Sequence, residues 1–127
     1  MKIKEVSQKY NITETALRYY EKVGLFDDVK RINNIREYED KDIERLSMIM
    51  SLKKVGLHIQ AILRFLKLMK DNRDTRNERI LILNKQRQEL MDQIHQYQKN
   101  LDSLDFLIYE LKDCHKCDHK EDLWKQY

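Results

Sequence analysis

The fold of this chain is decided by residues 80–111, which read ILILNKQRQELMDQIHQYQKNLDSLDFLIYEL. Apolar side chains recur there in alternating steps of three and four, a strict seven-residue repeat that is typical of a coiled coil. A helix over this stretch spans roughly 50 Å, at about 1.5 Å per residue. We call the repeating positions the heptad row: Ile80, Leu83, Arg87, Leu90, Ile94, Tyr97, Leu101, Leu104, Ile108 and Leu111.

The heptad row needs a partner helix, and the rest of the sequence offers none of comparable length. The simplest partner is the same helix in a second copy of the chain. We therefore expect a homodimer with a seam formed by Leu83, Leu90, Ile94, Tyr97, Leu101, Leu104 and Ile108.

The composition favours a mainly helical protein with a small core. Among 127 residues there are two glycines and no proline, and 37% of the residues are charged, which suits long uninterrupted helices better than a compact enzyme. The sequence has no glycine-rich phosphate loop and no Ser-His-Asp or paired-carboxylate setting, so we expect no enzymatic activity. It has neither a secretory leader nor an apolar run of membrane-spanning length, which favours the cytoplasm and no membrane partner.

The excess positive charge lies in the first half of the chain. Residues 1–66 hold 13 Lys or Arg and 10 Asp or Glu, a difference of +3 (13 − 10), whereas the remainder holds 12 of each (25 − 13 and 22 − 10). The first half is therefore the side expected to meet phosphate groups.

Two short helices are predicted at the N-terminus. Ile3, Val6 and Tyr10 recur at helical spacing, residues 11–13 interrupt the pattern, and a second helix follows over residues 14–23 and stops at Gly24. This is the pattern of a helix-turn-helix, although an ordinary helical hairpin has the same pattern. One face of the second helix is apolar, and the opposite face carries groups suited to phosphates and base edges, as well as to plain solvent: Thr15, Arg18, Tyr19 and Lys22.

Residues 30–38 alternate apolar and polar side chains on each side of Asn33-Asn34, and Asn tolerates the left-handed geometry of tight hairpins. The pattern predicts a short two-stranded wing. Its cations Lys30, Arg31 and Arg36 suit a wing that lies along the DNA backbone, whereas the alternative is a charged surface hairpin.

Two further helices are predicted before the long one. The third carries Ile43, Leu46, Ile49 and Met50 inward and stops at Gly56, and the fourth covers residues 58–69. The inward set of the fourth helix is expected to be Ile59, Ile62, Leu63, Leu66 and Met69. Thr75 and Glu78 then match a capping box, which predicts that the long helix begins at that point.

The first half of the sequence, with the elements predicted above, resembles the mercury-resistance-regulator (MerR) family of transcriptional regulators. The resemblance covers residues 3–57 without a gap and is carried by the stretches 3–6 (IKEV), 15–21 (TALRYYE), 24–25 (GL), 36–38 (REY) and 55–57 (VGL). The long helix stands where this family has its dimerisation helix. The fold implied is mainly α: a winged helix-turn-helix head followed by a long coiled-coil helix.

The resemblance implies a homodimer with an antiparallel coiled coil that binds a pseudo-palindrome in promoter DNA. Such regulators act on RNA polymerase by twisting and kinking a promoter spacer that is too long, in response to a stress or small effector. The DNA-contacting residues carried over or placed nearby are Thr13, Thr15, Arg18, Tyr19, Lys22, Arg31, Asn34, Arg36 and Tyr38. Asn34 stands where the family commonly has Gly, and Ile35 stands where it has an aromatic residue.

Within the family the chain is most similar to the branch that responds to aldehydes and thiol stress. That branch often has a cysteine in its third helix, where this chain has Ser51. A thiol trigger at that position is therefore not expected.

The only thiols belong to Cys114 and Cys117, and His119 follows two residues later. One interpretation is a Zn or Cu site formed by these three residues, a second is a reversible disulfide, and a third is a tail with incidental cysteines. Apart from such a metal we expect no cofactor.

The predicted domains are a head over residues 1–70, a coiled-coil helix over 75–112 and an effector or tail segment over 113–127. A competing hypothesis for the whole chain is a structural coiled-coil adaptor that does not bind DNA. Salt-dependent binding to duplex DNA separates the two, because phosphate neutralisation makes affinity fall with salt.

Overall fold

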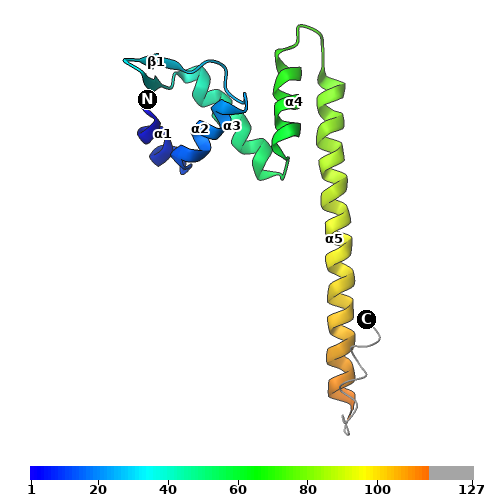
Figure 1. Ribbon diagram of the computed structural model, residues 1–127. Helices are drawn as coiled ribbons and strands as arrows, with labels where there is room; N and C mark the ends of the chain where they lie inside the picture. Colours follow the sequence, from blue (N-terminus) through cyan, green and yellow to red (C-terminus); the bar gives the residue numbers. More distant parts are fainter. Residues whose placement is uncertain (115–127) are drawn as a thin grey trace. The chain divides into compact units, whose positions relative to one another are not determined.

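The computed structural model describes residues 1–114 and is mainly helical, as expected (Figure 1). The described elements, in chain order, are α1 (Ile3–Tyr10), α2 (Glu14–Lys22), β1 (Lys30–Ile32), β2 (Ile35–Glu37), α3 (Asp40–Lys54), α4 (Ile59–Lys70) and α5 (Arg76–Asp113). No described helix is both long and apolar enough to cross a membrane.

Helices α1 and α2 each have one apolar face, and the turn that joins them is capped on both sides. Asn11 closes α1 in the left-handed conformation, with its backbone N–H donating to the Ser7 carbonyl. Thr13 opens α2, and its hydroxyl accepts a hydrogen bond of 3.0 Å from the Ala16 N–H. Because the turn between the two caps is so short, the buried side chains of Val6 and Leu17 enter one core.

The wing is a two-stranded antiparallel hairpin in which Ile32 faces Ile35 and Arg31 faces Arg36. Its two turn residues, Asn33 and Asn34, have φ values of 52° and 65°. Two consecutive positive φ values identify a type I′ turn, whose twist matches that of the strands. The turn predicted from the Asn-Asn pair is confirmed.

The head has one hydrophobic core to which α1, α2, the wing exit, α3 and α4 all contribute. Helix α4 buries Ile62, Phe65 and Leu66, whereas Met69, which the helical period placed inward, is 42% exposed. The buried core residues are Val6, Leu17, Tyr20, Leu25, Phe26, Val29, Tyr38, Leu46, Ile49, Leu52, Leu57, Ile62, Phe65 and Leu66.

The first turns of α5 belong to the head, because the compact unit that contains the head extends from Met1 to Gln86. Ile82 packs against the core, and the Gln86 side-chain amide donates a hydrogen bond of 3.0 Å to the Val55 carbonyl. The Thr75 hydroxyl donates to the Leu68 carbonyl at 2.6 Å. The head therefore reaches further along the chain than the end of α4, at residue 70.

The cap of α5 differs from the predicted capping box. Thr75 is buried and its hydroxyl bonds the end of α4, while the Arg76 N–H is bonded by the Asp74 carboxylate at 3.0 Å. Glu78 lies 3.9 Å from the Arg73 guanidinium instead of folding back over the helix start. The helix begins where the sequence predicted, but Asp74 supplies the capping oxygen.

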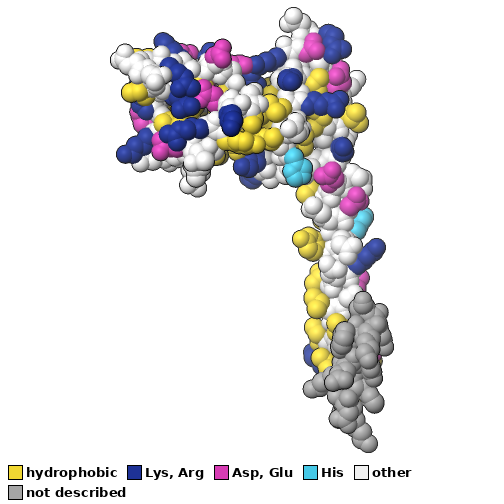
Figure 2. All heavy atoms as spheres, viewed as in Figure 1, with side chains coloured by type: hydrophobic (Ala, Val, Ile, Leu, Met, Phe, Trp, Pro, Cys, Tyr) yellow, Lys and Arg dark blue, Asp and Glu magenta, His cyan; other side chains and the backbone are white. Residues whose placement is uncertain are grey.

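The second compact unit begins at Arg87 and consists, in its described part, of the remainder of α5. Figure 2 shows hydrophobic side chains along one side of this helix. The apolar members of the heptad row are all exposed, with Ile94 and Tyr97 more than 60% accessible. The described part of the chain therefore leaves an uncovered apolar face at the spacing that a coiled coil requires.

Candidate nucleic-acid interface

The exposed face of α2 presents the side chains that the helical period predicted. Leu17 and Tyr20 are buried against the core, which turns the opposite face outward. That face carries Thr15, Arg18, Tyr19 and Lys22, all exposed. It combines two cations, a hydroxyl and a phenol, which can hydrogen-bond both phosphate oxygens and base edges.

Arg18 is held only loosely by its own chain. Its guanidinium lies 3.9 Å from the Glu14 carboxylate one turn earlier, at the limit of an ion pair, and both side chains are more than 40% exposed. Exposed pairs of this kind contribute little free energy. The guanidinium can therefore leave Glu14 for a phosphate or a base without a large cost.

The wing arginines are bonded to α2 rather than extended into solvent. Glu21 accepts hydrogen bonds from Arg31 at 3.1 Å and from Arg36 at 2.5 Å. Arg36 is also partly covered, with a side chain 23% exposed. Glu21 therefore fixes the hairpin beside α2. Arg36 helps to position the wing, a role beyond the contact with the DNA backbone that was predicted for it.

The prediction that Tyr38 contacts DNA needs correction. Its side chain is 2% exposed and packs edge-on against Phe26, with ring centroids 5.9 Å apart. Burial raises the pKa of the Tyr38 hydroxyl above its usual value. Tyr38 follows β2, where the chain turns into the core, so it anchors the base of the wing and offers no surface to DNA.

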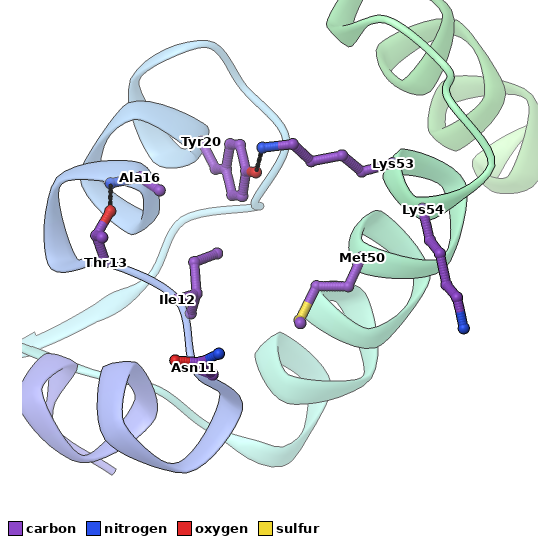
Figure 3. Close-up of a pocket in the computed structure, with 8 residues that line it drawn as sticks. All are labelled: Asn11, Ile12, Thr13, Ala16, Tyr20, Met50, Lys53 and Lys54. Atoms are coloured by element: carbon purple, nitrogen blue, oxygen red, sulfur yellow. Dashed lines mark hydrogen bonds between the residues drawn. The ribbon is translucent and has the colours of Figure 1, made fainter.

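An open pocket of about 410 Å³ lies between the turn of the helix-turn-helix and the C-terminal half of α3. Figure 3 shows Asn11, Thr13 and Tyr20 on one side and Met50 and Lys53 on the other. The Lys53 ammonium donates a hydrogen bond of 2.9 Å to the Tyr20 hydroxyl. The other residues that line the pocket are Ile12, Ala16 and Lys54.

Lys53 and Lys54 are candidate phosphate contacts that were missed in the sequence. They end α3, two residues before Gly56, and they line the same pocket as the turn of the helix-turn-helix. In the sequence they appear only as a pair of lysines at the end of a predicted helix. Such a pair is equally typical of cations that stabilise the negative C-terminal end of a helix.

Figure 2 shows lysine and arginine side chains spread over the visible face of the head. Within the head, Thr13, Thr15, Arg18, Tyr19, Lys22, Arg31 and Asn34 are all exposed. The α2 face, the wing and the lysine pair thus give the head exposed side chains of the kinds that contact nucleic acid.

The predicted metal ligands are only partly covered by the structure. Cys114 is exposed at the end of the described chain, and Cys117 and His119 lie outside the described residues. Within residues 1–114 no group of three or more potential metal ligands comes together.

Comparisons with known proteins agree with this geometry. Residues 1–69 match the model of the MerR HTH family regulatory protein, and residues 43–107 match the MerR DNA-binding family. The regulator AdhR of Bacillus subtilis is 36% identical over 93 residues, which cover 72% of this chain and 66% of AdhR. An uncharacterised HTH-type regulator of Haemophilus influenzae is 31% identical over 105 residues, covering 82% of this chain and 78% of that protein.

Solved structures show the same architecture. A MerR family regulator from Listeria monocytogenes is 32% identical and superposes with a TM-score of 0.69, over 98% of this chain and 95% of that one. HiNmlR, described as a MerR family regulator lacking the sensor domain and bound to promoter DNA, is 26% identical with a TM-score of 0.67, over 97% and 94% of the two chains. The family match covers more than half of the chain and agrees with the winged head and the long helix, and this protein therefore belongs to the MerR family of DNA-binding transcriptional regulators.

Proposed function

We propose that two copies of this chain bind one pseudo-palindromic operator in a promoter, each inserting the exposed face of α2 into the major groove. The wing of each copy then lies along the phosphate backbone. The observation that carries the proposal is the exposed set Thr15, Arg18, Tyr19 and Lys22 beside a wing that Glu21 holds in place. HiNmlR, which is similar over nearly its whole length, was captured on promoter DNA.

Lys53 and Lys54 extend the proposed contact beyond α2. They lie across the 410 Å³ pocket from Thr13, whose hydroxyl caps α2. Cations and helix N-terminal groups both favour phosphate oxygens. We assign the pair to a phosphate contact, which positions the head without reading sequence.

The proposed mode of regulation is deformation of the promoter. Two heads joined by paired α5 helices would hold two half-sites at a fixed separation, and an effector would change how the DNA between them is twisted. RNA polymerase then gains or loses contact with its two promoter elements, because their relative rotation depends on the twist of the spacer.

DNA binding is tested by replacing Arg18 with alanine. The expected loss is about 1–3 kcal/mol of binding free energy, with a shallower dependence of affinity on salt because fewer phosphates are neutralised. Arg64→Ala is the matched control, because Arg64 is exposed on α4 and loses the same charge. Equal affinities of the two variants in a fluorescence-anisotropy titration would remove α2 from the interface.

The deformation mechanism is tested on the DNA. In vitro transcription is measured from the natural promoter and from one whose spacer is shortened to the length that RNA polymerase prefers. We expect the shortened promoter to be active without the regulator and the natural one to depend on it. If both depend on the regulator equally, activation acts through protein contacts and not through twist.

A further inference from the structure

The antiparallel pairing of two α5 helices is what the family resemblance implies. Within it we infer one specific register, centred between Ile94 and Tyr97, in which Asp105 of the second copy neutralises Arg87. The inference rests on the homodimer proposed above and adds the alignment of its two helices. It follows from the heptad row, from the exposure of its apolar members and from the charges beside it.

The heptad row divides into two sets of equal size. Ile80, Arg87, Ile94, Leu101 and Ile108 occupy heptad position a, and Leu83, Leu90, Tyr97, Leu104 and Leu111 occupy position d. In an antiparallel pair each a residue faces a d residue of the other helix. Alignments that preserve this pattern differ by whole heptads, so only a few registers are available.

One of these registers pairs every member of the heptad row. Its layers are Ile94 with Tyr97, Leu90 with Leu101, Arg87 with Leu104, Leu83 with Ile108 and Ile80 with Leu111, each occurring twice by symmetry. A slide of one heptad in one direction leaves Ile108 and Leu111 without a facing residue, and a slide in the other direction leaves Ile80 and Leu83. Each of these four side chains is at least 39% exposed in the single chain, so either slide forfeits apolar burial.

Arg87 separates the same three registers by charge. In each register Arg87 faces a d residue of the second copy. The residue that follows this d residue occupies position e and lies beside Arg87. That position is Asp105 in the fully paired register, and Gln98 or Lys112 in the two slid ones. Only the fully paired register gives the guanidinium an opposite charge, and one slid register gives it a like charge.

Arg87 lacks a carboxylate partner within the described chain. Among residues 1–114 no ion pair involves Arg87, and its guanidinium lies 3.3 Å from Sδ of Met91, a weak acceptor one turn later. A charged group at a seam position costs stability in return for selecting a register. Asp105 is exposed on the same helix, so it is accessible to a second copy.

The register is measured by pulsed electron spin resonance on the full chain. A nitroxide is placed at Lys85→Cys or at Phe106→Cys, both in a Cys114→Ser, Cys117→Ser background. In the inferred register Lys85 is level with Phe106 of the other copy, so like labels lie 21 residues apart (106 − 85), or about 32 Å along the pair. Both variants should therefore give the same distance.

Slid registers break this equality. The two labels then lie about 21 Å apart along the pair in one variant and about 42 Å apart in the other. The direction of the slide decides which variant gives the shorter distance. Parallel helices bring both labels level with their copies. Unequal distances, or two short ones, would overturn the register, while a chain that sediments as a monomer would instead overturn the homodimer.

The charge pair is tested by reversing it. Arg87→Asp places a carboxylate beside Asp105 of the second copy, and we expect the dimer dissociation constant to rise at least about tenfold. Adding Asp105→Arg should restore it, and Arg87→Gln is the neutral control. Tighter dimers of Arg87→Asp would indicate Lys112 as the neighbour and overturn the inference.

Discussion

The hydroxyl of Thr75 connects the end of α4 to the start of α5. It is 2% exposed and donates to the Leu68 carbonyl at 2.6 Å. Thr75→Val keeps the shape and leaves this carbonyl without its donor. We expect the free energy of unfolding to fall by about 1–3 kcal/mol in urea titrations. Thr75→Ser retains the hydroxyl and should lose less, so equal losses would show that the methyl group matters more than the hydrogen bond.

The burial of Tyr38 gives a prediction about DNA affinity. Tyr38→Phe removes a hydroxyl that is enclosed in the head, so operator affinity should stay within about twofold of the parent. Tyr19→Phe removes the hydroxyl of a ring that is 47% exposed on α2, and affinity should fall by about 1 kcal/mol, as for a lost hydrogen bond. A larger loss for Tyr38→Phe than for Tyr19→Phe would instead place the Tyr38 hydroxyl in the DNA interface.

Asp27 gives stability a dependence on pH. The hydrogen bond from Lys70, followed by that from Arg45, holds the pKa of its carboxyl below the usual value, despite some opposing burial. A lowered pKa in the folded state means that the contribution is present above the unfolded pKa, near 4, and is lost as pH falls through the folded value. Asp27→Asn should therefore be less stable than the parent at pH 7, and the difference should vanish once the pH falls below the folded pKa of Asp27.

The size of that difference is limited by exposure. The Asp27 side chain is half exposed, so its two ion pairs are screened by water and should contribute no more than about 1 kcal/mol. Thermal melts of the parent and of Asp27→Asn across this pH range provide the measurement. A difference that persists in acid would assign the effect to packing.

At the scale of elements, the turn between α3 and α4 depends on a glycine. Gly56 has a φ of +95°, and a Cβ added there would lie 2.6 Å from Nε2 of Gln86. Gly56→Ala should lower the free energy of unfolding by about 1–2 kcal/mol through backbone strain, plus the cost of displacing Gln86 from the Val55 carbonyl. In a Gln86→Ala background only the strain remains, so the penalty measured by denaturation should be smaller.

Elements with a local cause were predictable from the sequence. The faces of α2, the Asn33-Asn34 turn and the heptad row each depend on a short-range period or on one residue's backbone preference. Phe65, Tyr38 and Lys53 were not predictable, because their roles depend on which element packs against them. Met69 shows the same limit: the period of α4 placed it inward, but the core beside it is filled by Phe65 and Leu66.

At the scale of the whole molecule, the structure predicts where the head can be separated from the rest. A fragment ending at residue 70 loses Thr75, Ile82 and Gln86, which bond or cover α3 and α4. A fragment ending at residue 86 keeps all three. We expect the longer fragment to melt cooperatively at a higher temperature, and the shorter one to be less stable, as followed by circular dichroism.

The contact of Gln86 with Val55 also limits how such proteins can be recombined. A chimaera that joins this head to another regulator's dimerisation helix at the α4–α5 loop would replace the side chain that bonds the turn after α3. The natural crossover point lies after Gln86, inside a continuous helix, where a junction must preserve heptad phase. Exchange of the segment after Gln86 between relatives therefore keeps the heptad row continuous only when the two helices are joined at the same heptad position.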